Sequence, residues 1–336
     1  MNNLPRYSGP PRASTDGFTV MEMLVAMTVF LILGAALASF MNYAISAYSI
    51  NRARTASYSS GMAILGQFES DVSQAFLAPG DRNENVDVRF LGNKDATGNT
   101  SLIFVASSRN PLESRTDLGL REIAWNVDAT AGAFPLNICR TQRDGVGGPE
   151  SLFTKRPQPG TFFASNVGFF EVRFFPDMGS LVDENVTFTP DEVNYGLPSW
   201  DSTRGDLSSF KLYTMNSLLA PWDDIMMERI AVTLTIIPND GMRTVLTSTL
   251  DANSSAINVD ITDGFPPNAD DMQSYLLIDS EWIKFTTSDL QSFTAAPGGR
   301  GARNTTATSH NAGAIVRAGF TFYRTVYIAC RGKAAR

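Results

Sequence analysis

Gly-Phe-Thr-Val-Met-Glu-Met-Leu-Val-Ala-Met-Thr-Val-Phe-Leu-Ile-Leu occupies residues 17–33 and opens a run that has no further charge before Arg52. Glu22 is the only charged side chain in this run. A helix needs ~20 apolar residues to cross a bilayer, and this run is longer. A carboxylate deep in a bilayer costs on the order of 2.5–3.5 kcal/mol. We therefore expect a partner for Glu22 that offsets this cost.

The residues before the run set the expected orientation of the chain. Residues 1–17 are polar, and their positive charges, Arg6 and Arg12, favour the cytoplasmic side. A secretory signal would have a shorter apolar core and a small-residue cleavage site after it, so this reading is disfavoured. Arg52 and Arg54 weaken the charge asymmetry without reversing it. The sequence predicts a single-pass protein whose C-terminal part lies outside the cytoplasm.

The segment from Gly17 to Met27 resembles the cleavage and methylation motif of type IV prepilins and type II secretion pseudopilins. In that family a membrane-bound prepilin peptidase cuts after the glycine, and the new N-terminal residue is N-methylated. The resemblance implies cleavage between Gly17 and Phe18, N-methylation of Phe18, and Glu22 as the fifth mature residue. Asp16 departs from the Lys or Arg that commonly precedes the glycine. The alternative is an ordinary single-span anchor with a chance glutamate.

The same resemblance implies a partner for Glu22. In a filament, the N-terminal amine of Phe18 in one subunit can approach Glu22 of a neighbour. Opposite charges attract strongly in a low-dielectric bundle, and each relieves the unpaired burial of the other. We therefore expect the partner of Glu22 to lie outside its own chain. The implied partners of the whole protein are the prepilin peptidase, other minor pilins or pseudopilins, the major pilin and the inner-membrane assembly platform.

The helical pattern continues beyond the apolar run. Leu65, Phe68, Val72 and Phe76 follow helical spacing, and Pro79-Gly80 supplies a stop. We predict a spine helix over residues 18–78, transmembrane over 18–47, that is roughly 90 Å long at ~1.5 Å per residue. The stretch 65–76 resembles the lower helix of PilW-type minor pilins and J-type pseudopilins.

After this helix the sequence pattern predicts β-strands. Residues 79–250 contain short apolar or alternating runs separated by Gly, Asn, Asp and Pro. The expected fold is α+β, with the spine helix packed on an antiparallel sheet that forms the head. The candidate strands are Val86–Leu91, Ser101–Ala106, Arg121–Val127, Phe134–Thr141, Val167–Phe175, Phe210–Met215, Ile230–Pro238 and Arg243–Leu250.

Residues 251–318 read as a small β module inserted before the last strand of the head, with residues 319–336 as that strand and a tail. Residues 274–285 form a hairpin candidate, with Asp279-Ser280 as its turn. The pattern Ile-Asp-x-Glu…Arg-Gly…Thr…His-x-x-Gly-Ala-x-Val is similar to small β modules of phage tail proteins. We expect this module to serve surface contact or structural bulk.

The composition favours structure over catalysis. The formal net charge of −7 argues against a nucleic-acid binder. Two cysteines and one histidine are too few for a zinc site. Cys139 and Cys330 can form one disulfide if the head is exported, or can remain two buried thiols. Catalysis would have to use His310, for which a local hydrogen bond is the commoner role. We predict that the chain is not an enzyme and needs no cofactor.

Calcium is the one metal for which the sequence offers ligands. Asp260, Asp263, Asp270 and Asp271 supply hard oxygen ligands, and some pseudopilins bind this ion. Their spacing fits no fixed loop motif, so a solvated acidic loop is the alternative.

The function expected from these observations is that of a minor pilin or pseudopilin at the bacterial inner membrane, with its head in the periplasm. Its large head suits a filament tip or an assembly-priming complex better than a crowded shaft. The alternative is a membrane-anchored adhesin or binding module that displays residues 251–318, and a bitopic membrane enzyme is a third class.

Overall fold

The computed structural model divides the chain into two compact units, Met1–Ser49 and Ile50–Arg336, and each is described by itself. The described residues are 19–76, 89–94, 98–107, 119–128, 135–155, 160–176, 196–201, 227–238, 242–265 and 274–328.

Helix α1 runs from Val20 to Val72 and is the only helix in these described ranges longer than one turn. The expected helix over residues 18–78 is therefore too long at its C-terminal end. Backbone pairing with the sheet ends the helix, because the Phe76 amide donates to the Val105 carbonyl and the Ser107 amide donates to the Gln74 carbonyl. Ala75 forms an isolated antiparallel bridge with Ala106. Pro79-Gly80, the expected stop, lies outside the described residues.

The C-terminal part of α1 packs on a sheet through one face. Phe68 contacts the rings of Trp125 and Phe170 at centroid distances of 5.6 and 5.7 Å. The spacing of the buried positions follows the helical period, so one stripe of the helix enters the core. The buried residues of α1 are Ser57, Gly61, Ile64, Leu65, Phe68, Asp71 and Val72.

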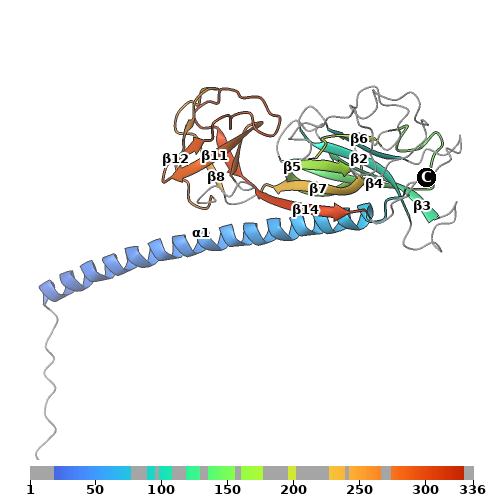
Figure 1. Ribbon diagram of the computed structural model, residues 1–336. Coiled ribbons are helices and arrows are strands. Elements are labelled where there is room, and N and C mark those ends of the chain that lie inside the picture. The colour runs from blue at the N-terminus through green and yellow to red at the C-terminus, as the bar shows by residue number, and fades with distance from the viewer. Residues whose placement is uncertain are drawn as a thin grey trace, which may run out of the picture. The chain divides into compact units, whose positions relative to one another are not determined.

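An eight-stranded antiparallel sheet receives this stripe (Figure 1). Its strand order is β14-β7-β5-β4-β3-β2-β1-β6. Alternate residues of its central strands enter the core, as in Ile230, Val232 and Leu234 of β7. The strands are β1 (Phe90–Lys94), β2 (Thr100–Ser107), β3 (Leu120–Asp128), β4 (Leu136–Asp144), β5 (Phe162–Pro176), β6 (Trp200–Asp201), β7 (Met227–Ile236) and β14 (Phe320–Tyr327).

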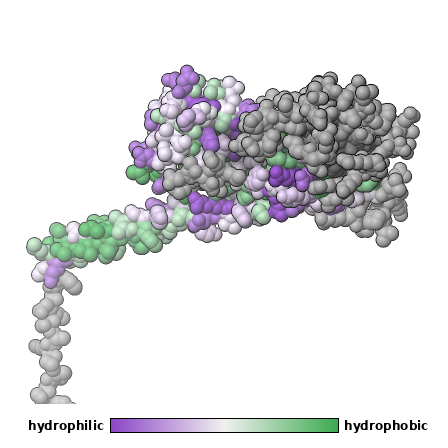
Figure 2. Space-filling model, viewed as in Figure 1, coloured by the Kyte–Doolittle hydropathy of each residue, from purple (hydrophilic) through white to green (hydrophobic). Residues whose placement is uncertain are grey.

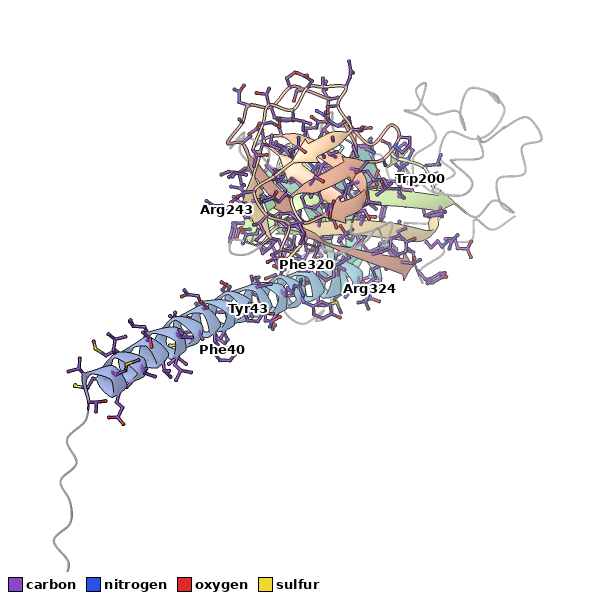
Figure 3. The ribbon with its side chains drawn as sticks, turned by 90° about the vertical axis from the view of Figure 1, so that its left-hand side faces the viewer. Phe40, Tyr43, Trp200, Arg243, Phe320 and Arg324 are labelled. Carbon is purple, nitrogen blue, oxygen red and sulfur yellow. The ribbon has the colours of Figure 1, made fainter. Side chains whose placement is uncertain are left out.

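Strand β14 lies against both β7 and α1. It pairs with β7 along its whole length, from Phe320↔Ile236 to Tyr327↔Arg229. Its Phe322 ring meets Tyr58 of α1 at 5.7 Å. Its Arg324, which is labelled in Figure 3, pairs with Glu69 of α1. Strand β14 thus forms one edge of the eight-stranded sheet.

A second, six-stranded antiparallel sheet has the order β8-β13-β10-β11-β12-β9. It has its own buried cluster, which includes Ile257, Ile283, Phe285 and Phe293. The strands are β8 (Arg243–Val245), β9 (Ala256–Asn258), β10 (Tyr275–Ile278), β11 (Glu281–Asp289), β12 (Ser292–Ala295) and β13 (Ile315–Ala318).

The hairpin predicted over residues 274–285 is present in this sheet, whereas strand β8 lies in a different sheet from the one predicted for it. Strands β10 and β11 are joined through Asp279 and Ser280, and Asp279 has a φ of 52°. The segment 243–250 was expected to be a strand of the head, but β8 pairs with β13 in the six-stranded sheet. Strand β8 belongs to the six-stranded sheet because Leu246 and Leu250, which follow it, are buried in the core of that sheet.

Arg303 joins the two sheets. Its guanidinium lies over Tyr275 and Trp282 of the six-stranded sheet at 4.0 and 4.5 Å, and over Phe169 of β5 at 4.6 Å. It also donates hydrogen bonds to Thr235 at 2.9 Å and Thr321 at 3.1 Å. Stacking a cation on aromatic faces is favourable when the site is desolvated. Burial lowers the pKa of Arg303 to about 10.

Candidate membrane and assembly segment

The N-terminal part of α1 exposes apolar side chains along its length. Figure 2 shows this surface on the face that it draws, and Figure 3 shows Phe40 and Tyr43 on it. Phe30 is 75% exposed, Phe40 67% and Tyr43 74%. Such exposure is costly in water, so this segment must be covered by lipid or by another protein. By its length and composition the helix is long and apolar enough to cross a membrane.

Glu22 has a partner within its own chain. The Thr19 amide and the Thr19 hydroxyl each donate to Glu22 Oε2 at 2.9 Å. The Glu22 amide donates back to Thr19 Oγ1 at 3.2 Å. This reciprocal arrangement is a capping box, which satisfies donors left free at a helix N-terminus. The charged partner that we expect from a neighbouring chain stays a prediction, and the capping box adds hydrogen-bond donors from within the same chain.

The capping box could have been found in the sequence. Thr19-x-x-Glu22 has the required spacing and directly precedes the apolar run. The cap uses only Oε2 of Glu22. Within the described residues no hydrogen bond reaches Oε1. Gly17 and Phe18, the predicted cleavage and methylation residues, lie outside the described residues.

The other end of α1 carries a buried carboxylate that sequence reasoning missed. Asp71 is fully buried and accepts hydrogen bonds from Arg140 Nε at 2.6 Å and Arg140 Nη2 at 3.0 Å. Trp125 Nε1 donates to it at 3.1 Å, and Gln67 Nε2 at 2.9 Å. A buried charge that is paired and hydrogen-bonded on all sides holds one geometry. This cluster therefore fixes the end of the helix on strands β3 and β4.

His310 and the glycine-rich segment 298–301, which the sequence offered as candidates for chemistry, contact charged side chains of the six-stranded sheet. Both ring nitrogens of His310 lie within hydrogen-bond distance of carboxylates, those of Asp279 and Glu281. Arg300, from the glycine-rich segment 298–301, pairs with Glu281. These contacts place His310 in a buried cluster of polar and charged side chains.

The predicted metal and disulfide residues are only partly described. Asp260 and Asp263 belong to the described residues and Asp270 and Asp271 do not; among those described, no cluster of three His, Cys, Asp or Glu side chains could hold a metal ion. Cys139 is buried in β4 with a free thiol, and burial raises its pKa. Cys330 lies outside the described residues.

Comparison with models of protein families and with curated proteins gives no match for this chain.

Proposed function

We propose that this protein is a minor pilin or pseudopilin, a structural subunit of a type IV pilus or of a type II secretion pseudopilus. The observation that carries the proposal is the division of α1. Its N-terminal part, to Tyr48, is exposed and apolar, with Glu22 as its only charge, while one stripe of its C-terminal part is buried on an antiparallel sheet. One helix can thus anchor the subunit in lipid and later pack against other subunits.

Processing would convert the anchor into an assembly surface. A prepilin peptidase would cut between Gly17 and Phe18, and Phe18 would be N-methylated. The capping box survives this cut because Thr19 and Glu22 both remain in the mature chain. Oε1 of Glu22 would then receive the amine of Phe18 from a neighbouring subunit. The two charges would stabilise each other in the apolar bundle.

The remaining assignments follow from this role. The precursor would be a single-pass protein of the bacterial inner membrane, with residues 50–336 in the periplasm. Residues 251–318, together with β8, would be a module inserted between strands β7 and β14, since these two strands are neighbours in the eight-stranded sheet. A head enlarged in this way supports a place at the filament tip or in the priming complex, where neighbours are fewer.

A membrane-anchored adhesin is the second candidate. The separate core of the six-stranded sheet favours it, because a module with its own core can be displayed as a recognition surface. The two candidates differ in the fate of the N-terminus. An adhesin that stays in the membrane needs no cut after Gly17.

Mass spectrometry of the mature N-terminus tests the proposal directly. The expected N-terminal residue is N-methyl-phenylalanine at position 18. A Gly17→Leu variant serves as the control and should retain residues 1–17. A chain purified from its native membrane with an intact Met1 would contradict the pilin proposal and leave the anchored adhesin.

A further inference from the structure

Four charged side chains form one cluster in the six-stranded sheet, and we call Asp279, Glu281, Arg300 and His310 the His310 clasp. Glu281 starts β11, and Asp279 lies in the turn before it. Arg300 and His310 come from the long segment between β12 and β13. The Glu281 side chain is fully buried, and that of His310 is 2% exposed. The clasp therefore holds charge inside the fold, which demands close pairing.

Glu281 is saturated with donors. Arg300 donates from Nε to Oε1 at 2.8 Å and from Nη2 to Oε2 at 3.0 Å. The Gly301 amide donates to Oε1 at 2.9 Å and the Thr308 amide to Oε2 at 3.0 Å. Despite burial, which opposes the charge, these donors lower the pKa of Glu281 to about 2. Glu281 is therefore ionised near neutral pH and only accepts hydrogen bonds.

His310 lies between two carboxylates. Its Nδ1 is 2.7 Å from Asp279 Oδ2, and its Nε2 is 2.8 Å from Glu281 Oε2. A neutral imidazole carries one donor and one acceptor nitrogen, so one lone pair would face a carboxylate. Only the imidazolium donates on both sides. With it, the clasp contains two positive and two negative charges, and without it one negative charge is left uncompensated.

We propose that the His310 clasp is a pH-sensitive device, closed while His310 is protonated and opened by loss of that proton as the pH rises. Within the described residues, the charged side chains within hydrogen-bond distance of the imidazole are those of Asp279 and Glu281, and Arg300 pairs with Glu281. Thr308 Oγ1, 3.5 Å from Nε2, is a neutral neighbour.

Opening the clasp would free residues 300–310 from the segments that they contact. Arg300 also donates to the carbonyls of Asp251, Ser254 and Thr308, at 2.5, 3.1 and 2.7 Å. The backbone of His310 pairs with that of Leu250 in both directions. The clasp thus holds residues 300–310 against residues 250–254 and the β10–β11 turn. Its loss would loosen residues 300–310 while the strands on either side keep their own pairing. This inference does not rest on the proposed pilin role.

The single histidine makes the test direct. The full-length chain, labelled with ¹⁵N-histidine and purified in detergent, has one imidazole to observe. We expect both nitrogens to be protonated at pH 6 in the folded protein. Hydrogen exchange at Gly301 and Thr308, corrected for intrinsic rates, should then accelerate up to about tenfold per pH unit as one proton is lost. Amides of β10 and β11 should keep their protection over the same range.

Asp279→Asn is the informative variant, because Asn tolerates the positive φ of the turn and can donate to a neutral Nδ1. It should fold and shift deprotonation of His310 to lower pH, with earlier opening of residues 300–310. Asp289→Asn, an exposed charge-matched change on β11, should behave as the wild type. A neutral imidazole in the folded wild type at pH 6, or identical exchange profiles for wild type and Asp279→Asn, would overturn the proposal.

Discussion

Asp71 of α1 and Arg140 of β4 form a two-point ion pair, in which one guanidinium donates to both oxygens of a fully buried carboxylate at 2.6 and 3.0 Å. The pair joins the last turn of the helix to the middle of the eight-stranded sheet. Two parallel hydrogen bonds fix orientation as well as distance. The end of the long helix is therefore held in one register on the head.

Asp71→Ala should destabilise the protein by about 3–5 kcal/mol, because it leaves the Arg140 charge and the Trp125 N–H without their buried acceptor. The free energy of unfolding can be measured by urea titration followed by circular dichroism. Glu150→Ala breaks an exposed ion pair with Lys155 and should leave the midpoint unchanged. Equal effects of the two changes would show that burial of the Asp71 pair has no special role.

Gly61→Leu and Gly66→Leu should have opposite effects on stability. A Cβ on Gly61 would lie 2.5 Å from Phe322 Cε2, whereas a Cβ on Gly66 has nothing within 4 Å. Overpacking at Gly61 should cost about 1–3 kcal/mol. Replacing the exposed helical glycine at 66 should gain roughly 0.5–1 kcal/mol. Thermal unfolding of the two variants side by side measures the difference, and a stabilised Gly61→Leu would refute the close helix–strand contact.

Glu22→Ala should leave cleavage after Gly17 largely intact but impair incorporation into filaments, because it removes the charge that would meet a neighbour's amine. Thr19→Val separates this effect from helix capping, since it removes the hydroxyl and keeps the carboxylate. Its filaments should be close to normal in amount. Immunoblotting of sheared filaments against membrane fractions measures incorporation. Normal assembly of Glu22→Ala would refute the charge pairing between subunits.

Glu281→Gln should flatten the acid limb of the stability profile. The pKa of Glu281 is lowered from 4.5 to about 2, so its ionised form stabilises the fold. That contribution is complete above about pH 4.5 and is lost as the pH falls toward 2. Urea midpoints measured at intervals from pH 7 to pH 2 should therefore fall less steeply for Glu281→Gln than for the wild type. Parallel profiles would mean that Glu281 is not held ionised by its neighbours.

Most strands could be placed from the sequence, but the residues at which they begin and end could not. Ser101–Ala106, Arg121–Val127 and Ile230–Pro238 correspond to β2, β3 and β7, because alternating apolar residues report a half-buried strand. The strand expected at Val86–Leu91 is described from Phe90 and runs to Lys94. Phe210–Met215 lies outside the described residues. Strand ends depend on pairing with a neighbour, which periodicity does not contain.

Helix α1 could likewise be predicted from the sequence, but its C-terminal end could not. Its apolar spacing predicted a helix to residue 78, yet it ends at Val72 where the backbone of residues 74–76 turns to pair with β2. Asp71 and Glu281 are charged side chains, and the residues next to them in the sequence do not indicate that either carboxylate is buried. Their partners, Arg140 and Arg300, are distant along the chain, and only folding brings them together.

Local chemistry in the sequence determined the long apolar helix, the lone charge of Glu22 and most of the strands, since spacing and composition act over a few residues. The tertiary structure alone decided where the helix ends, that β8 joins the six-stranded sheet, and that His310 lies between two carboxylates. These features depend on contacts between residues far apart in the chain, where burial makes each unpaired charge too costly to leave alone.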